Sequence, residues 1–250
     1  MKYFRGCKPD PRDRRDYRKA APRDYVPPDM AIVPGFQNLH ITDQGSNNSC
    51  TGNAVALWWQ QVLESRGERI GPLSWLYPWF YARAAEGVRE KNEGVSLRSI
   101  MQAVQEFGIP PLEYWSGQPI KKSPSQDALK YGRAIRLPDY ERCDTLLDIQ
   151  YSIAHEGQAV ILGTTIFADW MDGETARTGV VTYDPMTPVL DGHALVILAF
   201  DNRKQRFWGP NSWGTGWGDN GYFSLPYDFV TRERFDCWTA GYTALPDKSK

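Results

Sequence analysis

The pattern of apolar residues changes character about halfway along the chain. In the segment that starts at Ser49, apolar residues recur at three- and four-residue steps (Ala54, Leu57, Trp58, Val62), which is typical of an amphipathic helix. After about residue 157 the apolar runs are short and β-rich, and Gly, Asp and Asn divide them: QAVILGTTI, GHALVILAFD, KQRFWG and GYFSLP. A helical half followed by a mainly β half predicts an α+β chain of two lobes, with a substrate cleft between them.

Three helices are predicted in the first half. The first has Ser49 as candidate N-cap and ends near Gly67. The second, SWLYPWFYARAAEG, contains Pro78, so it either kinks there or begins its regular part there. The third, SLRSIMQAVQEFG, places its apolar residues on one face, with Ser96 as N-cap and Gly108 at its end.

The first 30 residues contain nine Lys or Arg and five Asp and are poor in apolar residues. The interleaved Asp residues favour a solvated arm on the surface over a nucleic-acid site. We divide a single domain, residues 1–250, into this basic arm (1–40), a mainly helical lobe (41–130) and a mainly β lobe (131–245), and we expect the arm to wrap the β lobe.

Charge and cysteine spacing exclude several classes of protein. The 29 Lys and Arg nearly cancel the 30 Asp and Glu, so no overall field favours nucleic acid or an anionic membrane. No run approaches the roughly 20 apolar residues of a membrane span, and the N-terminus lacks the apolar core of a signal peptide. We therefore expect a cytoplasmic protein, or one delivered without a Sec signal. The four cysteines are far apart, without CxxC or CxxH spacing, which favours free thiols over a zinc site.

Cys50 follows directly after the candidate N-cap of the first helix. Unpaired N–H groups and the helix dipole favour a thiolate at such a position, although many buried cysteines near helix starts only fill the core. A nucleophilic cysteine also needs a base. Of the three histidines, His155 is expected at the end of a helix, while His193 opens a buried strand, where it is either a base held beside a cleft or a half-buried structural residue.

Residues 209–226, GPNSWGTGWGDNGYFSLP, decide between these alternatives. This stretch resembles the asparagine segment of papain-like cysteine peptidases (the C1 family), whose hallmark is NSWG, then WG, then GY. Gln44, six residues before Cys50, and His193 match two further motifs of that family in order and spacing. The chain thus resembles a bacterial-type member that lacks the usual long prodomain. The resemblance covers about residues 40–226 and implies a papain-like two-lobed fold, with an antiparallel β lobe after the helical one.

The resemblance also implies a role for each matching residue. Cys50 would be the nucleophile, paired with His193 as acid and base, and Asn211 would orient the imidazole. Gln44 and the backbone N–H of Cys50 would form the oxyanion hole. Trp213 would shield the hydrogen bond between histidine and asparagine from water. Gly94 would pair with an extended substrate strand, and the specificity pocket would lie near Val95, Gly163 and Gly192. No metal or other cofactor is implied.

The expected function is therefore that of a cysteine endopeptidase acting on peptide or protein substrates as a monomer, without a nucleic-acid or membrane partner. Two alternatives keep the fold: an inactive binding protein, and another thiol acyl transfer by an isopeptidase, transamidase or peptidoglycan-stem hydrolase. Three departures from the family pattern affect efficiency and substrate preference. Thr51 replaces an aromatic residue, Gly192 replaces an acid or amide, and Pro210 removes a backbone donor.

Overall fold

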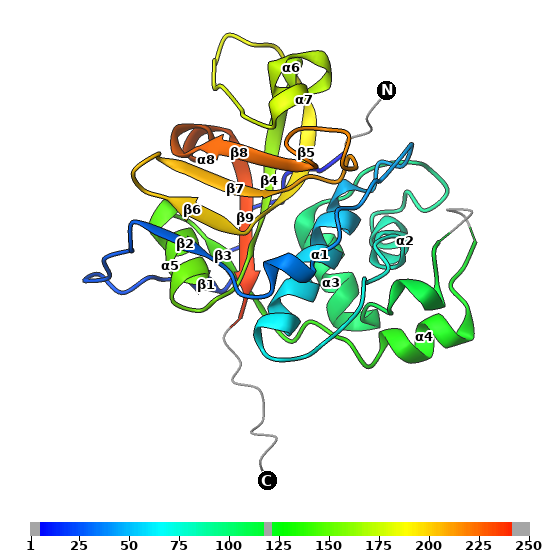
Figure 1. The fold of residues 1–250 in the computed structure, drawn as a ribbon. Coiled ribbons are helices and arrows are strands. Elements are labelled where there is room, and N and C mark those ends of the chain that lie inside the picture. The colour runs from blue at the N-terminus through cyan, green and yellow to red at the C-terminus, as the bar shows by residue number, and fades with distance from the viewer. Residues whose placement is uncertain (1–5, 118–121, 242–250) are drawn as a thin grey trace.

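The computed structural model describes residues 6–117 and 122–241. One lobe is helical and lies beside a lobe built from two sheets (Figure 1). The helical lobe contains α1 (Cys50–Ser65), α2 (Leu76–Ala85), α3 (Leu97–Phe107), the 3-10 helix η2 (Leu112–Tyr114) and α4 (Gln126–Gly132). The helices of the β lobe are η1 (Phe36–Asn38), α5 (Leu146–Ala154), α6 (Asp169–Asp172), α7 (Glu174–Thr178) and α8 (Tyr227–Glu233).

The β lobe contains a five-stranded and a four-stranded sheet. The first has the order β1-β3-β9-β4-β5 and comprises β1 (Arg18–Lys19), β3 (Tyr140–Cys143), β9 (Arg234–Ala240), β4 (Val160–Phe167) and β5 (Val189–Ile197). The second has the order β2-β6-β7-β8 and comprises β2 (Met30–Ile32), β6 (Ala199–Asp201), β7 (Arg206–Pro210) and β8 (Tyr222–Pro226). The neighbours are antiparallel except β1 and β3. The predicted α+β architecture is confirmed.

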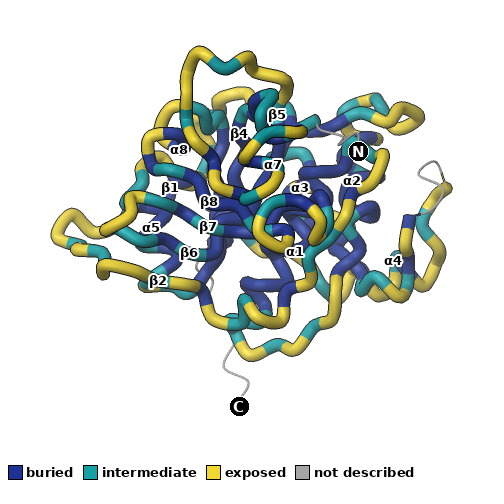
Figure 2. Tube along the Cα trace, turned by 45° about the horizontal axis from the view of Figure 1, so that its top comes forward, coloured by how far each residue is buried: buried dark blue, intermediate teal, exposed yellow. Residues whose placement is uncertain are grey.

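The three predicted helices form, and their ends follow from local chemistry. Pro78 is the third residue of α2, in the first turn, where its missing N–H has no intrahelical partner to lose. The hydroxyl of Ser96 accepts a hydrogen bond from Ser99 N and so caps α3, while Gly108 ends this helix with a φ of 74°. α1 packs against β5 and is buried along most of its length, so it forms the centre of the molecule. Figure 2 shows that the buried residues follow the helices and strands and the exposed ones the loops. Among the described residues, no helix has the length and apolarity needed to cross a membrane.

The arm contributes an edge strand to each sheet. β1 pairs with β3, and β2 pairs with β6, so residues 18–32 wrap the β lobe. The expectation of a solvated surface arm is wrong for its beginning, because Cys7 and Asp10 are buried. The amides of Gly6 and Cys7 both donate to the carbonyl of Gly192 in β5, and Lys8 N donates to Val95 O in the helical lobe. Residues 6–8 therefore lie between the two lobes.

Candidate active site

Cys50 is the first residue of α1, and its side chain is fully buried. Ser49 stands at the N-cap position, but its hydroxyl does not cap the helix; it accepts a hydrogen bond from Asn53 Nδ2 instead. Burial raises the pKa of the Cys50 thiol to about 12, although hydrogen bonds from the backbone N–H groups of Ala194, Thr51 and Gly6 act in the opposite direction. In this closed state desolvation therefore outweighs the helix terminus, which was expected to lower the pKa.

His193 lies within β5, and not at its start as predicted, because the strand begins at Val189. Residues 189–192 are more exposed, and His193 is the first residue of the buried part of the strand. Its Nε2 lies 2.8 Å from Asn211 Oδ1. The same oxygen accepts a hydrogen bond from Ser212 N at 2.8 Å, which identifies it as the carbonyl of the amide. Nε2 must then be the donor. The neutral imidazole therefore carries its proton on Nε2, and Nδ1 gains a proton only when the ring becomes cationic.

The imidazole and its partner are enclosed by aromatic rings. The Trp213 ring lies 4.7 Å from the His193 ring, centroid to centroid, and Trp213 in turn packs edge-on against Trp217 at 5.3 Å. Both indoles and Asn211 are buried. The hydrogen bond between His193 and Asn211 is shielded from water in this way and is therefore stronger than the same bond would be in solvent.

Gln44 is held by hydrogen bonds to Ser212, the residue that follows Asn211. Its Oε1 accepts a hydrogen bond from Ser212 Oγ at 2.7 Å, and its Nε2 donates to Asn47 O at 2.8 Å. Its backbone N donates to Ser212 O at 2.9 Å. Gln44 thus connects the loop that precedes α1 to the segment that carries Asn211.

Three of the predicted substrate-binding residues contact the chain's own N-terminal segment. A Cβ atom on Gly94 would lie 1.3 Å from the carbonyl oxygen of Gly6, and one on Gly192 would lie 2.0 Å from that of Cys7. Val95 O accepts the hydrogen bond from the backbone of residue 8. The backbone of residues 6–8 therefore occupies the groove in which a substrate strand was predicted. The fourth residue is Gly163. A Cβ atom there would lie 2.7 Å from the Phe235 ring and 3.3 Å from Leu97, so the side chains of these two residues fill the space beside Gly163.

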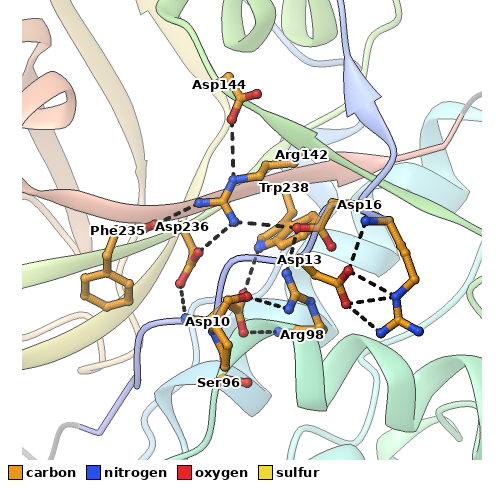
Figure 3. A network of polar contacts seen from close by, with 12 residues as sticks. Asp10, Asp13, Asp16, Ser96, Arg98, Arg142, Asp144, Phe235, Asp236 and Trp238 are labelled. Atoms are coloured by element: carbon orange, nitrogen blue, oxygen red, sulfur yellow. Dashed lines mark hydrogen bonds and ion pairs between the residues drawn. The ribbon is translucent and has the colours of Figure 1, made fainter.

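A network of acidic and basic side chains, which we call the arm clamp, holds the next part of the arm (Figure 3). Asp10 Oδ1 accepts a hydrogen bond from Arg98 N at 3.0 Å, and its Oδ2 accepts one from Trp238 Nε1 at 3.1 Å. Asp10 N donates to Asp236 Oδ2 at 2.6 Å, and Arg142 lies 3.1 Å from the other oxygen of Asp236. Asp16 also belongs to the clamp, since Arg98 donates to its carboxylate at 2.7 Å.

The clamp carries carboxylates that are difficult to ionise. Burial, together with the charge of Asp10, raises the pKa of Asp236 to about 7, despite the opposing effect of Arg142. Burial also raises the pKa of Asp10. These residues could not be recognised as a group from the sequence, because they come from four segments, the arm, α3, β3 and β9, which only the fold brings together.

Comparisons with known proteins identify what the chain is similar to. Residues 134–234 match the model of the papain family of cysteine proteases. An uncharacterized peptidase C1-like protein of Acanthamoeba polyphaga mimivirus is 28% identical over 222 residues, which cover 83% of this chain and 71% of that protein. Xylellain, a cysteine protease from Xylella fastidiosa, has the same fold with a TM-score of 0.88, at 22% identity and with 97% of each chain covered. A digestive procathepsin L 3 of Tenebrio molitor larval midgut matches with a TM-score of 0.72, at 15% identity, over 95% of this chain and 76% of that one.

The chain has the fold of papain-like cysteine proteases, and residues 134–234 match the model of that family, so this is the class of protein that the chain resembles. The resemblance inferred from NSWG, WG and GY is thereby confirmed, as is the papain-like two-lobed fold.

Proposed function

We propose that this protein is a cysteine peptidase that hydrolyses peptide bonds through a thioester on Cys50, and that residues 6–10 hold it closed. One observation carries most of the proposal. The sulfur of a buried cysteine at a helix N-terminus accepts a hydrogen bond from the N–H of Ala194, directly after the histidine that bonds to Asn211. This contact supports the proposed pairing of Cys50 with His193.

Each step of the reaction has a residue to perform it. The thiol of Cys50 passes its proton to Nδ1 of His193, and the thiolate adds to the carbonyl carbon of the peptide bond. The oxyanion that forms accepts hydrogen bonds from the amide of Gln44 and from the N–H of Cys50. The imidazolium then protonates the departing amine, the C–N bond breaks, and a thioester remains. Water, deprotonated by the neutral ring, hydrolyses this thioester and restores the thiol. Asn211 holds the ring through Nε2 throughout.

The N-terminal segment lies against the sulfur of Cys50. Among the described residues of this segment, Gly6 donates a hydrogen bond from its backbone N–H to that sulfur. The carbonyl of Gly6 points instead to Gly94. A peptide can therefore reach the thiol only after residues 6–10 have moved out of the groove.

A peptidyl epoxide and a fluorogenic peptide library test the proposal together. We expect the epoxide to add to Cys50, as seen by peptide mass mapping, and the library to be cleaved. Cys50→Ala should abolish both, whereas the control Cys143→Ala, which removes another buried thiol, should leave both intact. Epoxide labelling without cleavage of any peptide would favour a binding protein or another acyl donor. Absence of epoxide labelling at Cys50 in a chain whose Cys50 is alkylated by iodoacetamide would refute the proposed nucleophile.

A further inference from the structure

The side chain of Lys8 shows what the helical side of the groove can bind. Its ammonium lies 3.1 Å from Glu86 Oε2 and 3.8 Å from Glu93 Oε2. The backbone of Lys8 is at the same time paired with the groove, through the hydrogen bond to Val95 O and a parallel bridge to Ser96. A cationic side chain on an extended segment in this groove is therefore already seated between two carboxylates.

Both carboxylates belong to the walls of the groove and not to the arm. Glu86 follows directly after α2, and its Oε1 accepts a hydrogen bond from Ser96 N at 2.9 Å, so its position does not depend on Lys8 alone. Glu93 precedes Gly94, and its carbonyl accepts a hydrogen bond from Trp79 Nε1 at 3.2 Å, which fixes the backbone there. Both glutamates therefore stay at the groove when the arm moves.

The position of Glu86 at the end of α2 favours pairing of its carboxylate with a cation. A carboxylate at the C-terminal end of a helix faces the negative end of the helix dipole, which is unfavourable. In the described part of the helical lobe, Lys91 lies near this pair, 3.5 Å from Glu93 Oε1. Departure of Lys8 thus removes an ammonium from both carboxylates, and a cationic side chain of a substrate could take its position.

We propose that Glu86 and Glu93 form a subsite that selects a Lys or Arg side chain of the substrate, and that Lys8 fills this subsite in the closed state. The proposal rests on the peptidase function proposed above and names a substrate class for it, peptides with a basic residue near the scissile bond. The basic residue is the one whose backbone N–H reaches Val95 O, as that of Lys8 does.

The test compares two peptidyl epoxides that differ only in one residue, Lys or norleucine, with that residue placed in turn at each of the three positions next to the epoxide. Both reagents compete with the same arm, so the ratio of their labelling rates at Cys50 is independent of how often the arm opens. The measurements use the full chain carrying Asp10→Ala, which weakens the clamp. The key variant adds Glu86→Gln and Glu93→Gln, since a glutamine at 86 still accepts from Ser96 N. The matched control adds Glu90→Gln, which removes an acid of the same loop that pairs with Arg89.

We expect the lysine reagent to react about fivefold faster than the norleucine reagent at one position, as two partly exposed ion pairs allow. The ratio should fall to about one in the double glutamine variant and stay unchanged in the Glu90→Gln control. Equal rates for the two reagents at all three positions, or a ratio that survives loss of both glutamates, would overturn the subsite. Iodoacetamide separates this outcome from failure of the proposed function. If iodoacetamide alkylates Cys50 and neither peptidyl reagent does, the peptidase function is refuted.

Discussion

Removal of the Asp10 carboxylate should open the cleft. Asp10 lies four residues after Gly6 and anchors the arm at the point where it leaves the groove. The substitution Asp10→Ala removes the acceptors for Arg98 N and Trp238 Nε1 and leaves the backbone N–H that donates to Asp236 in place. Since the side chain contacts α3 and β9, the change should weaken docking of the arm more than the packing of either lobe.

The size of the effect follows from the two lost hydrogen bonds. A hydrogen bond to a charged group contributes about 1.5–3 kcal/mol, but burial raises the pKa of Asp10, which shows that desolvation of its carboxylate offsets part of this gain. We therefore take a loss of about 2–3 kcal/mol for both bonds together. At 1.36 kcal/mol for each factor of ten, the population with an open groove should rise about 30- to 150-fold.

The assay is the rate at which iodoacetamide alkylates Cys50 in the full chain, because this small reagent reports access to the sulfur and not recognition. The alkylation rate of Cys50 in Asp10→Ala should exceed that in the unaltered chain about 30- to 150-fold. The control is Asp13→Ala, an aspartate of the same arm whose carboxylate pairs with the exposed Arg15, and its rate should change by about twofold or less. If Asp10→Ala folds with an unchanged circular dichroism spectrum and its Cys50 reacts at the original rate, the clamp does not hold the groove closed.

Three further predictions follow from single contacts. In Gly94→Ala the new Cβ would lie 1.3 Å from the carbonyl of Gly6, so the arm should be expelled and iodoacetamide should react faster, whereas Gly71→Ala, with open space around it, should react as before. Asp236, whose pKa is raised from 3.8 to about 7, keeps its proton in the folded chain at pH values where the unfolded chain has lost it, so its contribution to stability falls as the pH rises between those values. The difference in thermal midpoint between Asp236→Asn and the unaltered chain should grow over that range, and parallel curves would contradict this. Asn211→Ala removes the acceptor of the imidazole and should slow epoxide labelling about fivefold, while an unchanged rate would show that other contacts hold the ring.

The sequence predicted those features that depend on residues close together in the chain. α1 begins directly after Ser49 and ends two residues before Gly67, and α3 lies between the capping Ser96 and Gly108, as apolar periodicity and these residues predicted. The start of β5 was misplaced because residues 189–192 are more exposed and carry no apolar run. They form a strand only because Thr165 and its neighbours in β4 supply the hydrogen-bonding partners.

The position of the arm could not be predicted from its composition. Arg, Asp and Pro are typical of a solvated segment, and residues 11–18 are largely exposed as this suggests. The buried part is short, and it is held by backbone hydrogen bonds, by a clamp assembled from distant segments, and by the fit of Gly6 onto Gly94. A glycine opposite a glycine allows two backbones to touch, and this pairing has no signature in a single sequence.

The raised pKa of Cys50 has the same origin as the blocked groove. Desolvation is its largest cause, and Gly6, which lies against the sulfur, belongs to the segment that must leave. When the arm moves away, water reaches the sulfur and the cause that raises the pKa weakens, while the N–H groups of Ala194 and Thr51, which lower it, stay in place because they belong to β5 and α1. Loss of the Gly6 hydrogen bond acts in the opposite direction but is compensated by hydration. Under the proposed peptidase function, we therefore expect opening of the groove and activation of the Cys50 thiol to occur together, with the closed form blocked to substrate and its thiol kept protonated.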